Sequence, residues 1–381
     1  MKKNSNKILF VLQFVGQPRF AKRMSMLSEQ GFTVEAVAFE RTTHRGRSPS
    51  ASVTTLGNIS HGHFLKRIPT LLRSLPLLRK KIQSNDVVYC MGPDMSLLTS
   101  LASLGLKTRK VVEVADIHPI QTRDDVIGKI ARLADKWQMK NSDFLVVTAP
   151  NFQDIYYSQW LKSTTPGMVI ENKVENAASS NIPNYLEETT HTLESKVGSP
   201  AQITIGYFGL LRCKWSWDVL VQLMKDNPTS HKLVLAGVPL GITDFEEVIE
   251  NNSNIEYRGP YKSPGDLPEL YQSVDLVWAC YPPIAYDNWN HKWARPNRFY
   301  EACLYRKPLI TRDGSNDSIV VNEMNIGCLL DDVVPKDAAD SLASISLDEV
   351  LQWHLQMKKL PVSVYQHTTE AEHLGEVIKE L

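Results

Sequence analysis

The chain has 381 residues, more than one hydrophobic core usually organises, so we expect two domains. Hydrophobic residues make up 43% and charged residues 22% of the chain, a globular composition that excludes a disordered or fibrous protein. The net charge is zero, but residues 1–150 carry 23 Lys and Arg against 11 Asp and Glu. This asymmetry predicts an anionic partner for the first half. The five cysteines are odd in number and widely spaced, which indicates neither a disulfide framework nor a metal site.

The first apolar run, residues 8–15, is interpreted as a buried strand. Gln13 interrupts the run, and Pro18 and Arg19 follow it in place of the small-residue cleavage site of a signal peptide. No apolar segment approaches the roughly 20 residues that cross a bilayer. We therefore expect a soluble cytoplasmic protein.

Residues 1–175 alternate short apolar segments with helical patterns, which predicts a parallel sheet built from right-handed βαβ units. The expected strands are 7–14, 33–39, 86–91, 110–117, 144–148 and 168–171. The expected helices are 20–30, 64–84, 95–104, 127–140 and 151–160. The next segment, 176–200, is rich in Ser, Asn, Thr and Glu and has little apolar periodicity, so we expect a linker there.

The expected helix at 64–83 places leucines at helical spacing among cationic side chains. The cations are Lys66, Arg67, Arg73, Arg79, Lys80 and Lys81. A basic amphipathic helix is typical of proteins that contact an anionic membrane surface, so we expect such a surface as a partner. A packed helix with a solvated basic face is the alternative, and Pro69 and Pro76 would kink either form.

Asp116 and His118 come at the end of an expected central strand. Side chains two positions apart share a face of a strand, so these two face one way and Glu113 faces the other. Ligands bind at the carboxyl ends of parallel strands, and a buried aspartate beside a histidine there is suited to removing a proton from a hydroxyl. A helix-capping Asp and a turn His would give the same pattern.

From Gln202 the alternation restarts, which predicts a second parallel sheet. Its expected strands are 203–208, 232–236, 255–258, 276–279, 309–311 and 327–330. Its expected helices are 217–225, 244–251, 264–273 and 296–304. The final stretch, 338–381, is helical in pattern with a break at Pro361.

Gly209 follows the first strand of this second half. A glycine at a strand-to-loop turn lets a phosphate approach the backbone, and Arg212 and Lys214 would supply the counter-charge. A glycine that only relieves a tight turn is the alternative, and the residues alone leave the two about even.

A second anion site is predicted where a short helix opens after Pro296. Arg295 and Arg298 lie beside the exposed N–H groups of its first turn, with Asn297 between them. Glu301 follows within a turn or so of a strand end. A carboxylate there can accept both hydroxyls of a ribose while the arginines hold a diphosphate, which indicates a nucleotide-sugar. A solvated acid with surface arginines is the alternative.

This stretch, together with residues 259–282, resembles the donor domain of GT-B glycosyltransferases of the family 4/family 1 group. The shared features are a glycine with a polar turn, a short helix, an aspartate before a buried strand, a helix with a proline, a basic residue and a glutamate, and a lysine–proline strand entry. The C-terminal half matches well and the N-terminal half matches by topology. The resemblance implies an α/β protein of GT-B fold, with two facing Rossmann-like domains and a C-terminal helix that crosses back to the first.

The domain bounds that follow are an acceptor-binding domain at 1–175, a linker at 176–200, a nucleotide-sugar-binding domain at 201–360 and a C-terminal helix at 361–381. The activity implied is transfer of a sugar from a nucleotide-diphosphate sugar, with a UDP-sugar expected, to a saccharide or lipid-linked acceptor in cell-surface polysaccharide or glycoconjugate synthesis. No separate cofactor and no nucleic-acid partner are expected.

The resemblance also implies roles for the candidate residues. Gly209, Arg212 and Lys214 correspond to the donor-phosphate loop. The strand end at Asp116 corresponds to the reaction centre, which makes Asp116 the candidate base and His118 a residue that orients the acceptor or stabilises charge. Metal independence follows from the cations and from the lack of a convincing Asp-x-Asp motif.

One departure from the family pattern concerns the donor sugar. Many members carry two glutamates eight positions apart, and the first would fall at Trp293 here. The missing glutamate favours an inverting reaction. Two further hypotheses stay open, a GT-B-fold sugar-nucleotide epimerase and a non-catalytic sugar-nucleotide-binding scaffold. For the transferase we expect a cytoplasmic enzyme, peripheral on the inner face of the cell membrane.

Overall fold

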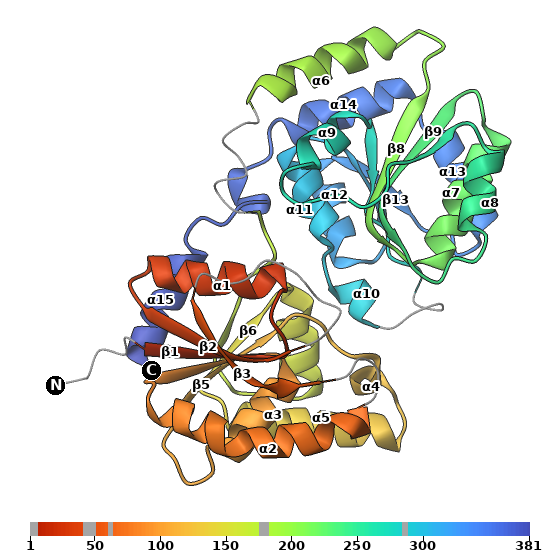
Figure 1. Ribbon diagram of the computed structural model, residues 1–381. Coiled ribbons are helices and arrows are strands. Elements are labelled where there is room, and N and C mark those ends of the chain that lie inside the picture. The colour runs from red at the N-terminus through yellow and green to blue at the C-terminus, as the bar shows by residue number, and fades with distance from the viewer. Residues whose placement is uncertain (1–6, 41–50, 60–63, 175–182, 284–288) are drawn as a thin grey trace. The chain divides into compact units, whose positions relative to one another are not determined.

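The chain divides into two compact units, which are described separately here (Figure 1). Unit 1 comprises Met1–Asn172 and Thr368–Leu381, and unit 2 comprises Lys173–His367. The computed structural model describes residues 7–40, 51–59, 64–174, 183–283 and 289–381.

Unit 1 contains a seven-stranded, fully parallel sheet of order β3-β2-β1-β4-β5-β6-β7. The strands are β1 Lys7–Leu12, β2 Thr33–Glu40, β3 Ser52–Asn58, β4 Val87–Met91, β5 Arg109–Val114, β6 Phe144–Val147 and β7 Gly167–Val169. The helices are α1 Pro18–Glu29, α2 Phe64–Gln83, α3 Pro93–Ala102, α4 Pro119–Thr122, α5 Val126–Lys140, the π-helix η1 Phe152–Trp160 and α15 Glu370–Glu380. The strand order reverses between β1 and β4, which makes their carboxyl ends the topological switch point.

Helices cover both faces of this sheet, so its central strands are buried on both sides (Figure 1). On one face, Ile8 and Phe10 of β1 pack with α1 and with Leu374 and Ile378 of α15. On the other face lie α2, α3 and α5. The return of α15 to unit 1 confirms the predicted C-terminal helix that crosses back.

Unit 2 contains a six-stranded parallel sheet of order β10-β9-β8-β11-β12-β13. The strands are β8 Ile203–Leu211, β9 His231–Pro239, β10 Ile255–Tyr257, β11 Leu276–Trp278, β12 Leu309–Arg312 and β13 Gly327–Leu330. The helices are α6 Pro183–Lys196, α7 Lys214–Asp226, α8 Phe245–Asn251, α9 Leu267–Gln272, α10 Trp289–Trp293, α11 Asn297–Leu304, α12 Asn316–Met324, α13 Pro335–Ala343, α14 Leu347–Met357 and the 3-10 helix η4 Val362–Val364. Its switch point lies between β8 and β11.

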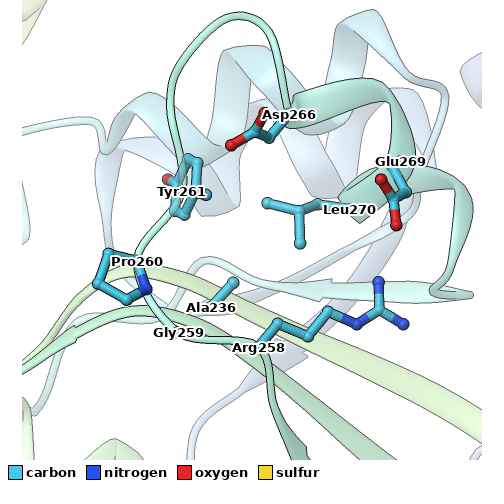
Figure 2. Close-up of a pocket in the computed structure, with 8 residues that line it drawn as sticks. All are labelled: Ala236, Arg258, Gly259, Pro260, Tyr261, Asp266, Glu269 and Leu270. Carbon is cyan, nitrogen blue, oxygen red and sulfur yellow. The ribbon is translucent and has the colours of Figure 1, made fainter.

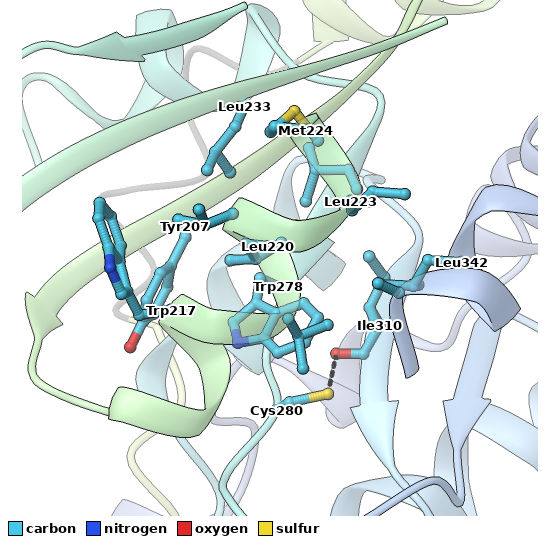
Figure 3. Close-up of a cluster of buried hydrophobic side chains, with 14 of the residues drawn as sticks. Tyr207, Trp217, Leu220, Leu223, Met224, Leu233, Trp278, Cys280, Ile310 and Leu342 are labelled. Carbon is cyan, nitrogen blue, oxygen red and sulfur yellow. Dashed lines mark hydrogen bonds between the residues drawn. The ribbon is translucent and has the colours of Figure 1, made fainter. Parts of the chain in front are cut away.

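Strand β8 is fixed by a hydrophobic core on each face. Tyr207 points into the core formed with α7, α8 and α13, which also holds Trp217 (Figure 3). In this core Trp217 stacks on Phe245 at 5.1 Å between ring centroids. The next residue, Phe208, points into the core formed with α9, α11 and α12 and meets Tyr271 at 5.2 Å. Because large aromatic groups bury much apolar surface on both sides, the carboxyl end of β8 has a defined position.

Several segments differ from the sequence prediction, among them the helices α4, α10 and α12, which were not predicted. Edge strand β3 was not predicted, because its polar alternation lacks a buried apolar run. Residues 152–160 form a π-helix where an ordinary helix was expected. The expected linker, 176–200, contains α6, whose Leu193 is buried in the core of unit 2, and its residues 176–182 lie outside the described residues. The domain bounds proposed from the sequence stay a prediction.

No helix in the described part of the chain is long and apolar enough to cross a membrane.

His354 of α14 gives unit 2 a pH-dependent stability. Its ring is fully buried, its Nδ1–H donates to the Arg306 carbonyl at 2.8 Å, and its Nε2 lies 3.0 Å from the Thr190 hydroxyl of α6. Burial lowers the pKa of His354 from 6.5 to about 4. The unfolded chain therefore takes up a proton between these pH values that the folded chain does not.

We expect the free energy of unfolding to fall as the pH drops from 6.5 to 4, by at most roughly 3 kcal/mol from this residue. Urea denaturation followed by tryptophan fluorescence at several pH values measures the effect. His354→Gln should be less stable at pH 7 and should show a flatter dependence. Parallel pH profiles for the parent and the variant would contradict the assignment.

Candidate functional site

Glycines occupy the carboxyl ends of three neighbouring strands in unit 2. Gly209 in β8, Gly237 in β9 and Gly259 after β10 have φ of +107°, +132° and +76°. A Cβ on Gly237 would lie 1.8 Å from the Gly209 carbonyl oxygen, and the Gly237 N–H donates to the Gly259 carbonyl at 2.8 Å. Only glycine fits this backbone packing. The result is a glycine-lined edge that begins at β8, beside the switch point, where open α/β sheets bind ligands.

Gly209 lies within β8, because the strand continues to Leu211 and does not end at residue 208 as predicted. A Cβ on Gly209 would lie 3.5 Å from Arg298 Nη1 and 4.0 Å from the Tyr261 hydroxyl. The absence of a side chain here therefore leaves the Gly209 backbone beside a guanidinium and a phenol.

Arg298, the second residue of α11, is held at the end of β8. Its Nη1 donates to the Phe208 carbonyl at 2.8 Å, and its guanidinium lies 5.0 Å from the Tyr207 ring centroid. Its Nε is buried and makes no hydrogen bond within the described ranges. The guanidinium is thus positioned by β8 and keeps a donor that the surrounding protein does not use.

Glu301 lies one turn further along α11, between two tyrosines. The Tyr271 hydroxyl donates to Glu301 Oε2 at 2.7 Å. Burial, with a further contribution from the Glu301 carboxylate, raises the pKa of both Tyr271 and Tyr261. Both phenols therefore stay protonated over the physiological range, and Tyr271 is a hydrogen-bond donor to Glu301.

A pocket of about 160 Å³ opens next to these residues (Figure 2). It is lined by Ala236, Arg258, Gly259, Pro260, Tyr261, Asp266, Glu269 and Leu270. The segment after β10 forms one side and α9 the other, and Tyr261 joins the pocket to the Glu301–Arg298 region. Its volume is close to the roughly 150 Å³ of a cavity that holds a benzene ring. Apart from Ala236, the lining residues all lie within residues 258–270, and the sequence prediction missed the pocket because the pattern of this stretch does not show which of its side chains face a cavity.

Arg295, predicted with Arg298 as an anion-binding pair, is turned into the protein. Its Nε donates to Asp317 Oδ1 at 2.8 Å, and the two side chains are 7% and 2% exposed. Its guanidinium also lies 4.5 Å from the Phe299 ring centroid. This buried pair joins the start of α11 to α12, so Arg295 supports the helix that carries Arg298.

The remaining predicted residues of unit 2 lie at the surface of the same edge. Arg212 is exposed after β8, and Lys214, the exposed first residue of α7, forms an ion pair with Asp218 one turn on. Asn297 is exposed at the first position of α11.

Trp293 is fully buried and lies 5.3 Å from Trp289 between ring centroids. The position of the missing glutamate is thus an apolar packing position.

Asp116 and His118 lie on the loop after β5 in unit 1. The prediction that Asp116 is buried was wrong, because its side chain is 71% exposed, with Arg19 Nη1 at 4.0 Å. His118 is also exposed, and its Nδ1 accepts a hydrogen bond from the Ile120 N–H at 3.2 Å. Ile117 between them is buried, and Asp116 and His118 both face solvent. Their catalytic roles stay a prediction.

The loop that carries Asp116 and His118 is anchored to a buried carboxylate. The Gln121 side chain accepts from the His118 N–H and donates to Asp135 Oδ2 of α5, and the Tyr156 hydroxyl of η1 donates to the same oxygen. Burial raises the pKa of Asp135. Three distant segments meet here, which is why the sequence pattern did not point to them.

The buried carboxylate of β5 is Glu113 rather than Asp116. Arg23 Nε donates to Glu113 Oε2 at 2.7 Å, Arg23 Nη2 donates to Oε1 at 3.2 Å, and the Tyr89 hydroxyl donates to Oε2 at 2.5 Å. These bonds join α1, β4 and β5 below the loop.

A second polar contact of unit 1, also missed by the sequence prediction, lies at its switch point. Gln13 Nε2 lies 2.7 Å from both carboxylate oxygens of Asp94, which follows Gly92 at a φ of +103°. Burial raises the pKa of Asp94. A glycine and a proline directly after β4, followed by an acid, are the sequence signal that could have identified this position.

The described residues hold no group of three or more His, Cys, Asp or Glu side chains arranged to bind a metal ion.

Comparison with known proteins shows one curated relative. The succinoglycan biosynthesis protein ExoL of Rhizobium meliloti (strain 1021) is 27% identical over 344 residues, which cover 85% of this chain and 81% of that protein. No family model matches the sequence.

Solved structures match the chain over nearly its whole length. Anabaena Alr3699/HepE in complex with UDP shares 14% identity, with 98% of this chain and 100% of that chain covered and a TM-score of 0.68. Sucrose-phosphate synthase from Thermosynechococcus elongatus shares 11% identity, with 98% of each chain covered and a TM-score of 0.74. WaaG, a glycosyltransferase involved in lipopolysaccharide biosynthesis, shares 14% identity, with 97% of this chain and 99% of that chain covered and a TM-score of 0.68. These neighbours are GT-B glycosyltransferases, and the predicted GT-B fold is confirmed.

The two carboxylates of the β5 region should differ in their effect on stability. Glu113→Ala leaves the Arg23 guanidinium buried without its partner, which we expect to cost about 3–5 kcal/mol of unfolding free energy. Asp116→Asn should change it by less than about 0.5 kcal/mol, because the side chain is exposed. Urea denaturation of both variants provides the comparison. Equal destabilisation by the two substitutions would refute the distinction.

Proposed function

We propose that the protein is a glycosyltransferase that moves a sugar from a nucleotide-diphosphate sugar to a saccharide acceptor in the synthesis of a cell-surface polysaccharide or glycoconjugate. The observation that carries this proposal is the convergence of a ring-sized pocket, Glu301, Arg298 and the Gly209 backbone at one sheet edge. The UDP bound to HepE and the role of ExoL in succinoglycan biosynthesis, as their names state them, support it.

The base, the ribose and the diphosphate of a nucleotide-sugar each have a matching group along this edge. The base enters the pocket beside Tyr261, and the Glu301 carboxylate, oriented by Tyr271, accepts the ribose hydroxyls. The diphosphate lies against the Gly209 backbone and Arg298. A UDP-sugar is the donor we expect, in line with the HepE complexes with UDP and with UDP-glucose.

Breaking the glycosidic bond places negative charge on the diphosphate that leaves. Arg298 is already in position to stabilise that charge, and Arg212 and Lys214 are exposed cations at the same strand end. Asn297 adds a polar group at the start of α11, while Arg295 fixes the helix through Asp317. With these cations in place, we propose that the reaction does not depend on a metal.

In unit 1, Asp116 is our candidate for the base that removes the proton of the acceptor hydroxyl, and His118 orients the acceptor or stabilises charge. Exposure makes both side chains accessible to an acceptor, and the Gln121–Asp135 contact fixes their loop. Attack assisted by a base opposite the leaving group inverts the anomeric carbon. We place the reaction in the cytoplasm, with a lipid-linked acceptor at the inner face of the membrane.

The role of Glu301 is tested by the binding of UDP. Glu301→Ala should weaken UDP binding by about 1.5–3 kcal/mol for each charge-assisted hydrogen bond lost, measured by calorimetry. The matched control is Glu323→Ala, which removes an exposed helical acid of the same unit and should leave UDP affinity unchanged. An unaltered UDP affinity in Glu301→Ala would exclude the ribose contact.

The role of Asp116 is tested by turnover with a panel of labelled nucleotide-sugars. Asp116→Asn should lower turnover by about 10²–10⁴-fold while UDP affinity stays near that of the parent. Full activity of this variant would transfer the base role to His118. Across the panel, slow release of free sugar supports the transferase, an epimeric product would indicate an epimerase, and binding without turnover would indicate a scaffold.

A further inference from the structure

Gln13 and Asp94 meet at the switch point of unit 1, where β1 and β4 end. Gln13 directly follows β1, and Asp94 is the second residue of α3, three positions after the end of β4. A Cβ on Gly92 would lie 3.0 Å from Asp94 Oδ1 and 3.4 Å from Gln13 Nε2, so the glycine leaves room for the pair. Open α/β sheets bind ligands at such a point.

The contact between Gln13 and Asp94 leaves hydrogen-bond acceptors unused. Asp94 Oδ1 accepts from Gln13 Nε2 and from the Met95 N–H at 3.0 Å, whereas Oδ2 accepts from Gln13 alone. Gln13 Oε1 accepts no hydrogen bond from the residues that the structure describes. Each of these oxygens has two lone pairs, and both side chains are half-buried rather than closed off from solvent. The pair can therefore accept further hydrogen bonds.

Two buried carboxylates of unit 1 are occupied differently. Glu113 accepts three hydrogen bonds from a guanidinium and a phenol, and Asp135 accepts from an amide and a phenol. Asp94 forms no ion pair with a described residue, and its side-chain partner is the neutral amide of Gln13. Burial raises the pKa of Asp94, whereas Gln13 lowers it. A carboxylate that is partly desolvated beside a neutral amide is stabilised by additional donors.

Asp94 and Asp116 follow neighbouring strands at equivalent positions. Met91 of β4 pairs in register with Glu113 of β5, and the Gly92 N–H donates to the Glu113 carbonyl at 2.8 Å. Each aspartate comes three residues after this pair, and adjacent strands are about 4.8 Å apart. A ligand bound at Asp94 therefore lies at the strand next to the one that leads to our candidate base.

We propose that Gln13 and Asp94 bind two adjacent hydroxyl groups of the acceptor saccharide, Gln13 through Oε1 and Asp94 through Oδ2. The inference rests on the proposed function, because it gives the acceptor of that reaction a binding site. Two acceptor oxygens side by side match the two O–H donors of a vicinal diol, whereas an anionic group would be repelled by the carboxylate. Gln13 and Asp94 thus select the acceptor, and the base role stays with Asp116.

The test is saturation-transfer NMR of the full chain with the methyl glycosides of glucose, galactose and mannose and with their monodeoxy analogues. The parent should bind at least one glycoside, and removal of either hydroxyl of one adjacent pair should weaken its binding about tenfold. Asp94→Asn should weaken binding of the complete glycoside by about tenfold or more, and Gln13→Ala by about threefold to tenfold. The analogue that lacks the hydroxyl bound by Asp94 should lose nothing further in Asp94→Asn, because that contact is already absent.

The matched control is Glu29→Gln, which neutralises an exposed acid at the last position of α1 and should bind the glycosides as the parent does. The inference is overturned if the parent binds none of the glycosides, or if Asp94→Asn binds them as tightly as the parent. A pair that only links β1 to α3 would lower the melting temperature of both variants and leave glycoside affinity unchanged, which overturns it too.

UDP binding separates this inference from the proposed function. Calorimetry should show UDP affinity near that of the parent in both variants, which also establishes that they are folded. If the parent does not bind UDP, the proposed function fails, and the glycoside measurements still decide whether Gln13 and Asp94 bind a saccharide.

Discussion

The candidate donor site depends on the close approach of β8 and β9 at Gly209 and Gly237. No Cβ fits at Gly237, because it would lie only 1.8 Å from the Gly209 carbonyl oxygen. The strand that brings Gly209 there is held between two aromatic cores, through Tyr207 on one face and Phe208 on the other. Backbone groups at such an edge can meet a ligand directly, and helix α11 then brings Arg298 and Glu301 to the same place.

Arg295 and Arg298 are three residues apart but have different partners, and the partner determines whether the charge of each arginine is neutralised within the protein. Arg295 faces a carboxylate that is as buried as itself, and removing either partner would leave a buried charge, so its role is to fix α11. Arg298 faces a carbonyl and an aromatic ring, neither of which neutralises it. The positive charge that remains at the strand end belongs to Arg298, and that residue can stabilise a diphosphate.

The fold was largely predictable because the central strands of both sheets are continuous apolar runs bounded by helical patterns. The sequence prediction missed edge strand β3, because only one side of this strand is paired. It missed α6, because the contact of Leu193 depends on a helix distant in the chain. For the candidate site, Glu301 and Arg298 were predicted from one local motif. Tyr271, Tyr261 and the pocket were not, because the pattern of residues 258–271 does not show which side chains face Glu301 or a cavity. The burial expected for Asp116 belongs to Glu113, whose partners Arg23 and Tyr89 lie far from it in the chain.

Hydrogen exchange of the full chain with and without UDP, in buffer containing EDTA, tests the proposed donor site most directly. If UDP lies along the glycine edge, protection should increase in residues 208–212, 258–261 and 297–301, all of which border the pocket, Gly209 or Glu301. The rest of unit 2 should change little. Absence of protection at saturating UDP, or protection confined to unit 1, would contradict the assignment of the donor site to this edge.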